Sequence, residues 1–259
     1  MSASVPLRLA LTALENSGAA ASHVARELLA HALVPEPRPL GLATGSTMVP
    51  VYSALVEAAR RLPDEQRQHL RRHWLSYNLD EYLGLGRTHP GSFAAFMHSR
   101  LTEPLGLDPA SVRLPDGLAP DPLAEAARYA AEIVASGGIG LQLLGLGVNG
   151  HVGFNEPPCA ATSRCRPVRL SAATRRHNAG AFAADPAAVP ERAITLGLAE
   201  ILAADRILLV VSGAAKADVL GRLLRQQPSP ELPASWLQGH PAVAVIADRA
   251  ALGGVAGAA

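Results

Sequence analysis

A short segment at residues 145–156, GLGVNGHVGFNE, places Asn149, His151 and Glu156 directly after an apolar run. A histidine can accept and donate protons near neutral pH, and a neighbouring amide or carboxylate can decide which ring nitrogen holds the proton. The segment therefore predicts a catalytic loop in which His151 transfers protons. The alternative interpretation is a hydrogen-bonded turn histidine.

The same segment contains the glycine pattern GxGxxG at residues 145–150, which binds dinucleotides when a helix begins at that point. Here the chain continues through Gly153 to Pro157 and Pro158, and such residues disfavour a helix. We therefore expect no nicotinamide cofactor. The sequence contains neither HExxH nor a comparable spacing, and its two cysteines lack a CxxC spacing. It predicts no metal site and no cofactor.

Two adjacent acids, Asp80 and Glu81, follow the apolar run at residues 74–79. Neighbouring side chains of a strand point to opposite faces, so only one of the two carboxylates can readily face a site. We expect one of the two to act as a base and the other to support the loop. A helix cap or a solvated turn is the alternative interpretation of this acidic pair.

A candidate phosphate site follows the apolar run at residues 40–43, at Thr44, Gly45, Ser46 and Thr47. Small and hydroxyl residues ahead of a helix expose backbone N–H groups, and the positive end of the helix dipole attracts an anion. The segment lacks the Gly-Lys-Ser/Thr ending of a Walker loop. An ordinary helix cap is the alternative.

Lys216 is the second candidate for this phosphate site. It is the only lysine in a chain with 22 arginines, and it follows the apolar run at residues 206–211 and a Ser-Gly turn. A compact ammonium and a planar guanidinium are not interchangeable at a tight phosphate site. We therefore predict that the Lys216 ammonium contacts a phosphate. The alternative is a lysine retained by chance on a solvated helix.

Apolar runs that suit buried strands alternate with segments of helical periodicity along the chain. The expected strands are residues 40–43, 74–79, 139–146, 206–211 and 242–247. The expected helices are residues 5–33, 49–61, 92–101, 123–135 and 214–224. This alternation predicts an α/β fold with a doubly wound, mostly parallel, Rossmann-like sheet, helices on both faces, and one domain over residues 1–259. Such sheets bind ligands beyond the carboxyl ends of their strands, where the candidate segments fall.

The composition excludes several classes of protein. The formal net charge of +1 and the charged fraction of 17% provide no basic surface for nucleic acid or for an anionic membrane. No apolar run approaches the roughly 20 residues of a transmembrane helix. Arg8 and Glu15 interrupt the apolar N-terminal stretch, which favours an amphipathic helix over a signal peptide. We expect a cytoplasmic protein that binds neither nucleic acid nor membranes.

Taken in order, these segments resemble the glucosamine-6-phosphate deaminase family. The similarity covers most of the chain, and NGHVGFNEP is its most specific part. The matching blocks are LATGSTM, NLDEYLGL followed by HPGSFAAFM, LGLGVNGHVGFNEP, AITLGLAEIL and SGAAKADVL. The related 6-phosphogluconolactonases share the sheet and a Gly-His loop, but a Ser-Leu-Phe-Pro type of sequence usually follows that loop. FNEP at residues 154–157 favours the deaminases, with a lactonase-like hydrolase as the alternative.

The resemblance implies a cofactor-free reaction in which glucosamine 6-phosphate and water give fructose 6-phosphate and ammonia, combining isomerase and hydrolase chemistry. Asp80 matches the base that moves a proton between C2 and C1. His151, oriented by Asn149 and Glu156, matches the group that opens the pyranose by delivering a proton to the ring oxygen. The residues that match the phosphate site are Thr44, Gly45, Ser46, Thr47 and Lys216.

Two departures from the family's pattern concern the reaction. Many members carry aspartate where this chain has Asn149, whose amide can orient His151 but cannot stabilise an imidazolium by charge. An arginine that contacts the phosphate usually occupies the position of Gly180, so Arg175 or Arg176 would have to compensate. Phosphate affinity or substrate choice therefore differs from the usual pattern.

A third departure concerns regulation. Members that N-acetylglucosamine 6-phosphate activates carry polar residues where this chain has Cys159 and Val168, although Arg166 matches. We expect that allosteric site to be absent.

Gly180 motivates a second hypothesis, in which the same proton transfer isomerises or deaminates a different amino sugar phosphate. A third hypothesis is a non-catalytic sugar-phosphate sensor, which the ligand would stabilise without forming product. The intact set of Asp80, His151 and Glu156 stands against a sensor. In every case the partner is a small sugar phosphate, and the sequence leaves a homo-oligomer open.

Overall fold

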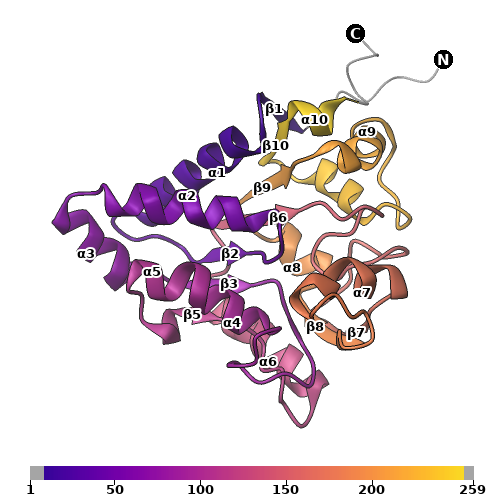
Figure 1. Ribbon diagram of the computed structural model, residues 1–259, viewed down its shortest axis with the longest axis horizontal. Coiled ribbons are helices and arrows are strands. Elements are labelled where there is room, and N and C mark those ends of the chain that lie inside the picture. Colours follow the sequence, from indigo (N-terminus) through magenta and orange to yellow (C-terminus); the bar gives the residue numbers. More distant parts are fainter. Residues whose placement is uncertain (1–8, 254–259) are drawn as a thin grey trace.

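The computed structural model describes residues 9–253, which form a seven-stranded sheet flanked by helices (Figure 1). Every pair of neighbouring strands in this sheet runs parallel. In spatial order the strands are β1 (Ala10–Leu14), β10 (Val243–Asp248), β9 (Arg206–Val211), β6 (Leu141–Gly145), β2 (Leu40–Leu42), β3 (Ser76–Asn78) and β5 (Val112–Arg113). The chain moves outward from β2 to β5, returns to β6 and then moves outward in the opposite direction. The order therefore reverses between β2 and β6, which is where doubly wound sheets bind ligands.

Helices cover both faces of the sheet. The side chains of its central strands are therefore buried whichever face they point to. Residues 141–144 of β6 and 207–211 of β9 are at most 1% exposed. On one face, α1 (Ser17–Ala32) packs along α2 (Met48–Arg60) (Figure 1). The predicted doubly wound α/β fold is confirmed.

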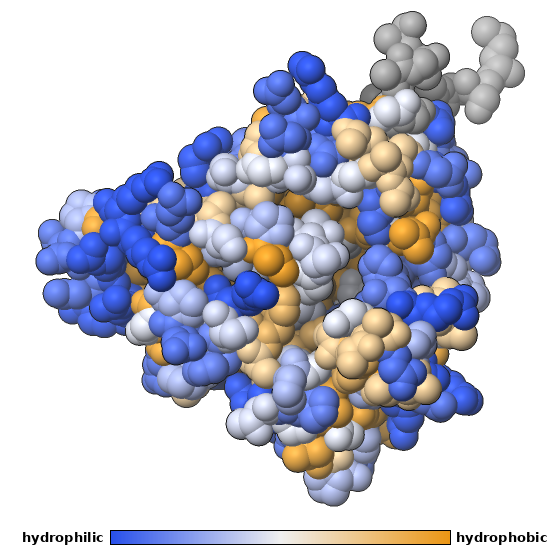
Figure 2. Space-filling model, viewed as in Figure 1, coloured by the Kyte–Doolittle hydropathy of each residue, from blue (hydrophilic) through white to orange (hydrophobic). Residues whose placement is uncertain are grey.

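The other helices connect strands or flank the sheet. They are α3 (Asp64–His73), α4 (Phe93–Met97), α5 (Glu103–Leu105), α6 (Pro122–Ala135), α7 (Ala172–Asn178), α8 (Leu198–Leu202), α9 (Ala217–Arg225) and α10 (Arg249–Leu252). Figure 2 shows a hydrophilic surface over α3, of which only Leu70 is buried. Within residues 9–253, no helix is both long enough and apolar enough to cross a membrane.

The N-terminal part of the chain differs from the prediction of one helix over residues 5–33. Residues 10–14 form the edge strand β1, which pairs with β10, and α1 begins only at Ser17. The Asn16 side chain accepts the N–H of Ala19 and so caps α1. The leucine and alanine spacing suits both structures, and only pairing with β10, from the other end of the chain, selects the strand. Residues 5–8 lie outside the described part of the chain.

Most other expected elements are present with shifted ends. The helix expected over residues 92–101 is the exception, because it consists of α4, a π-helical turn at His98–Thr102 and then α5. From His98 the backbone hydrogen bonds follow the wider π-helical pattern. The spacing of apolar side chains in the sequence does not reveal such a change.

A second, three-stranded antiparallel sheet was not predicted. It consists of β4 (Asp80–Tyr82), β8 (Arg192–Thr195) and β7 (Arg166–Arg169). These strands are short, and the arginines of β7 and β8 obscure the alternation that marks a strand. Tyr82, Phe154 and Phe182 belong to a small core of their own beside this sheet. The sheet bears on the candidate site because its strand β4 carries Asp80, one of the predicted site residues.

Candidate active site

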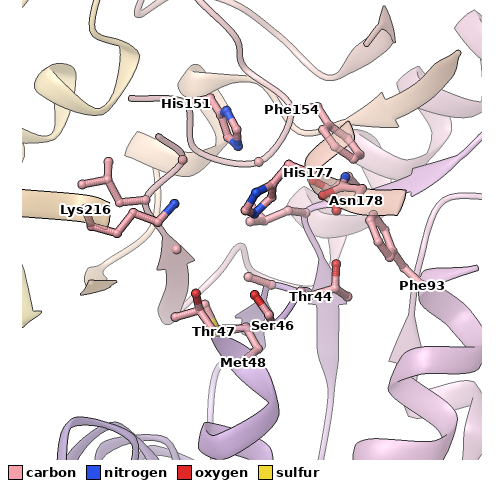
Figure 3. Close-up of a pocket in the computed structure, with 18 residues that line it drawn as sticks. Thr44, Ser46, Thr47, Met48, Phe93, His151, Phe154, His177, Asn178 and Lys216 are labelled. Atoms are coloured by element: carbon pink, nitrogen blue, oxygen red, sulfur yellow. The ribbon is translucent and has the colours of Figure 1, made fainter. Parts of the chain in front are cut away.

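A cavity of about 130 Å³ lies beside the carboxyl ends of β2 and β6, where the strand order reverses (Figure 3). Its walls come from the loops after these two strands, from β4, from the end of α7 and from the turn before α9. The polar residues that line it include Thr44, Ser46, Thr47, Asp80, His151, His177, Asn178 and Lys216. The tertiary structure thus brings together residues from all the candidate segments.

The loop Thr44–Thr47 connects β2 to α2 and borders the cavity (Figure 3). Gly45 has a φ of +101°, a left-handed conformation that suits glycine, and the N–H of Met48 donates to its carbonyl oxygen over 3.0 Å. Thr47 is the N-cap residue of α2, but within the described chain its hydroxyl forms no capping hydrogen bond. The Thr47 hydroxyl at this helix start is therefore available to an anion.

Lys216 ends the 3₁₀ turn Ala214–Lys216, immediately before α9. Gly213 precedes this turn, and its N–H donates to both carboxylate oxygens of the buried Asp248 over 3.1 Å. Figure 3 shows the ammonium group directed into the cavity. Burial lowers the pKa of Lys216, and a bound anion would offset the cost of burying its charge. The position suits the predicted phosphate contact.

Asp80, the first residue of β4, lines the cavity and is only 6% exposed. Burial raises the pKa of its carboxyl from the ordinary 3.8 to about 8, and the neighbouring charge of Glu81 adds to this rise. At neutral pH the carboxyl is therefore mostly protonated, and its ionised form is a stronger base than an ordinary aspartate.

Glu81 points away from the cavity, as the alternation of side chains along a strand requires. Its carboxylate accepts the N–H groups of Tyr82, Phe93 and Ala94 over 2.8 to 2.9 Å. Phe93 and Ala94 are the first two residues of α4, so Glu81 holds the start of that helix against β4. The two adjacent acids therefore occupy different environments.

His151 forms a hydrogen bond of 2.6 Å from Nδ1 to Oδ1 of Asn149. An amide oxygen can only accept, so Nδ1 carries the proton and Nε2 of the neutral ring keeps a lone pair. Burial lowers the pKa of His151 to about 4, the charge of Glu156 opposes this shift, and the charges of Lys216 and His177 add to it. At neutral pH, His151 is therefore a neutral proton acceptor.

Glu156 is not placed to orient His151 by a hydrogen bond, which was its expected role. Its carboxylate accepts the N–H of Ser171 over 3.1 Å, the Ser171 hydroxyl over 2.9 Å and the Thr174 hydroxyl. Ser171 is the N-cap residue of α7, so Glu156 anchors the start of that helix. Across residues 9–253 it forms no hydrogen bond with His151, and it acts on the ring only through its charge. Asn149 alone orients the ring by a hydrogen bond.

Two residues of the last turn of α7, His177 and Asn178, line the cavity and were not among the predicted site residues. The Asn178 Nδ2 group donates to the Tyr82 hydroxyl over 2.9 Å. His177 is exposed, and Figure 3 shows its ring inside the cavity. The sequence of α7, AATRRHN, has polar residues on several sides, so no pattern marks the face that meets the site.

The arginines expected to compensate for Gly180 do not line the cavity. Arg175 donates from Nε to the carbonyl oxygen of Val189 over 3.0 Å and from Nη2 to that of Ala187 over 3.1 Å. Its guanidinium therefore binds the segment that follows α7, and Arg176 is exposed. Gly180 borders open space among the described residues. The structure does not place Arg175 at the phosphate site.

Arg166 serves a structural purpose near the cavity. Its Nη1 group donates to Oδ1 of Asn155 over 2.9 Å, and its Nη2 group lies 3.6 Å from Sγ of the buried Cys159. The guanidinium thus holds the end of the loop that carries His151.

Over the described range 9–253, no group of three or more histidine, cysteine, aspartate or glutamate residues is placed to hold a metal.

Fold and site together define a doubly wound α/β protein whose cavity, at the reversal of strand order, is lined by Asp80, His151 and Lys216. More particularly, the chain belongs to the family of glucosamine-6-phosphate isomerases and 6-phosphogluconolactonases, because the family model matches residues 13–245. The resemblance found in the sequence blocks is thereby confirmed.

Individual relatives agree with this membership. The glucosamine-6-phosphate deaminase of Rhodopirellula baltica is 45% identical over 215 residues, which make up 82% of this chain and 82% of the relative. That of Hahella chejuensis is 43% identical over 209 residues, or 81% of this chain and 77% of the relative. A solved monomeric glucosamine-6-phosphate deaminase matches with a TM-score of 0.88 at 34% identity, over 95% of this chain and 100% of the other. The 6-phosphogluconolactonase of Trypanosoma cruzi shares the fold, with a TM-score of 0.75 at 18% identity over 96% and 98% of the two chains.

Proposed function

We propose that the protein is a glucosamine-6-phosphate deaminase, which converts glucosamine 6-phosphate and water into fructose 6-phosphate and ammonia. The observation that carries this proposal is the meeting of Asp80 and His151 with the Thr44–Thr47 loop and Lys216 around one cavity. Relatives that bear this name at 43% and 45% identity support the choice of substrate. Charged sugar phosphates do not cross membranes readily, so we also propose the cytoplasm as the place of the reaction.

The first step is opening of the sugar ring. The 6-phosphate binds the start of α2 and the Lys216 ammonium, which places C1 near His151. Neutral His151 accepts the proton of the O1 hydroxyl at Nε2 and delivers it to the ring oxygen. The bond between C1 and the ring oxygen breaks, and C1 becomes an aldehyde. Asn149 keeps the proton on Nδ1, so that Nε2 does the transfer.

The second step moves a proton from C2 to C1. Ionised Asp80 takes the C2 proton while the substrate's ammonium group passes a proton to O1, which gives an enol that carries a neutral amine. Asp80 then returns its proton to C1, and the amine becomes an iminium at C2. Water adds to this carbon, the bond to nitrogen breaks, and ammonia leaves as ammonium. The remaining ketose is fructose 6-phosphate.

The pH dependence of the reaction should follow the ionisation of Asp80. Since burial raises the pKa of its carboxyl to about 8, kcat/KM is expected to rise with pH up to that value, because only the ionised form accepts a proton. Carbon NMR of aspartate labelled at the carboxyl carbon measures this directly, with the signal assigned by its loss in Asp80→Asn. Glu81→Gln should lower the midpoint by removing a neighbouring negative charge. A midpoint near the ordinary 3.8 would contradict the prediction.

Replacement of Lys216 should weaken phosphate binding. Loss of a charge-assisted hydrogen bond in Lys216→Ala should raise KM for the phosphorylated substrate about tenfold to hundredfold and weaken inhibition by inorganic phosphate. Lys216→Arg should rescue poorly, because a longer planar fork replaces a compact donor. Arg225→Ala, at the exposed far end of α9, is the matched control for charge. If Lys216→Arg binds phosphate like the parent, the site does not require the compact ammonium of a lysine.

Incubation with glucosamine 6-phosphate, followed by assays for ammonia and fructose 6-phosphate, tests the activity itself. We expect both products in equal amounts. Turnover of another amino sugar phosphate or of 6-phosphogluconolactone, without turnover of glucosamine 6-phosphate, would show that the substrate is wrong. Gly180 gives a reason to include other amino sugar phosphates. Thermal stabilisation by these ligands without any product would instead support the sensor hypothesis.

A further inference from the structure

His177 is a cavity residue to which the proposed reaction assigns no task. It lies in the last turn of α7, and its ring stands in the cavity with His151 and the Lys216 ammonium (Figure 3). Both ends of α7 are anchored, the first by Glu156 and the last by the hydrogen bond from Asn178 to Tyr82. The helix therefore holds His177 at a defined place beside the site.

The charges around the cavity do not balance a phosphate without His177. Lys216 is the only lysine or arginine among the described residues that line the cavity. The pKa of Asp80 is raised to about 8 and that of His151 is lowered to about 4, so both side chains are mostly neutral at pH 7. The lining then contributes about one positive charge, whereas a phosphate monoester carries about −1.5 to −2 at that pH.

An imidazolium at position 177 would supply the missing charge, because a nearby anion favours the protonated form of a histidine. We propose that the His177 imidazolium is the second cation of the phosphate subsite, opposite Lys216. Binding of a dianion whose own charge does not change should then weaken as the pH rises from 6 to 8. The substrate class in this inference rests on the proposed function.

The other charged groups around His177 bear on this pH dependence. Asp80 from β4, His151 from the loop after β6 and Lys216 from the turn before α9 face it across the cavity. Its own helix adds Arg175 and Arg176, which do not line the cavity. Ionisation of Asp80 also weakens anion binding above pH 7, so each His177 variant must be compared with the parent at the same pH.

Sulfate is the probe of choice, because it remains a dianion from pH 6 to pH 8 and needs no turnover. Its affinity is measured by calorimetry at both pH values for the parent, His177→Gln and His177→Lys. Arg176→Gln is the matched control, since it removes a charge from the adjacent, exposed residue of the same helix. Thermal midpoints establish that each variant folds.

At pH 6, His177→Gln should bind sulfate about tenfold to hundredfold more weakly than the parent, and this difference should shrink by pH 8. His177→Lys should bind well at both pH values. For the substrate, His177→Gln should raise KM at pH 6 and leave kcat nearly unchanged. A raised KM with an unchanged kcat distinguishes a contact with the anion from a role in proton transfer.

Three results would overturn the inference. His177→Gln could bind sulfate like the parent at pH 6, Arg176→Gln could weaken binding by the same factor, or the variant could lose kcat instead of affinity. A failed assay for ammonia leaves the sulfate experiment intact and counts against the deaminase proposal alone. Failure of the sulfate prediction with normal ammonia release counts against the role of His177 alone.

Discussion

Asp80→Asn is expected to abolish exchange of the substrate's C2 proton with solvent and to lower kcat by about 10²-fold to 10⁴-fold. The amide cannot accept the C2 proton, whereas its size and position resemble those of the carboxyl. Binding of the substrate should therefore remain nearly intact. Proton NMR in deuterated water measures the exchange, and competitive inhibition measures the binding. Near-normal exchange in the variant would transfer the role to another group, with Glu81 the first to test.

Stability measurements provide the control for this variant. Burial raises the pKa of Asp80 in the folded state from the ordinary 3.8 to about 8, so folding favours the neutral carboxyl. Its contribution to stability is complete below the ordinary value and is lost as the pH rises through about 8. Asparagine is neutral throughout, so the stability of Asp80→Asn relative to the parent should increase from pH 4 to pH 8. Urea unfolding at several pH values tests this trend, and a stability difference between variant and parent that stays constant from pH 4 to pH 8 would contradict it.

His151→Gln should reduce turnover of the closed pyranose by about 10²-fold to 10⁴-fold, because glutamine cannot carry a proton from O1 to the ring oxygen. An analogue that lacks the ring-forming hydroxyl groups bypasses this step. Its turnover should fall much less. Steady-state rates for both substrates, each relative to the parent, give the comparison.

The control for His151→Gln is phosphate binding, which we propose depends on Lys216 and the Thr44–Thr47 loop and which should not change. Equal loss of rate with the cyclic and the open-chain substrates would argue against ring opening as the role of His151. It would instead point to a general effect on the cavity or on Asp80.

Several features of the fold were predictable because their signals are local. The strands that became β2, β3, β6, β9 and β10 are short apolar runs bounded by turn residues. Burial on both faces of a parallel sheet requires such runs, so the pattern and the structure share one cause. The strand β1 and the sheet of β4, β8 and β7 lack this pattern. They form because distant segments pair with them, and no local signal reports such pairing.

The candidate site, like the fold, has parts that the sequence predicts and parts that it does not. The cavity positions of Asp80, His151, Lys216 and Thr44–Thr47 follow from the rule that ligands bind where strands end, and each of these segments follows an apolar run. The side chain of Glu81 points away from that of Asp80 because successive side chains of a strand point to opposite faces. These inferences needed only the order of elements along the chain.

The sequence by itself determined the class of fold, the family and the segments that carry chemistry, since strand ends, turns and motif blocks are encoded within a few residues of each other. Only the tertiary structure decided which groups meet. It turned Glu156 toward the start of α7, directed Arg175 to the carbonyl groups of Val189 and Ala187, and brought His177 into the cavity. These outcomes depend on where α7 packs. That position is set by contacts between residues far apart in the chain, which periodicity and spacing do not record.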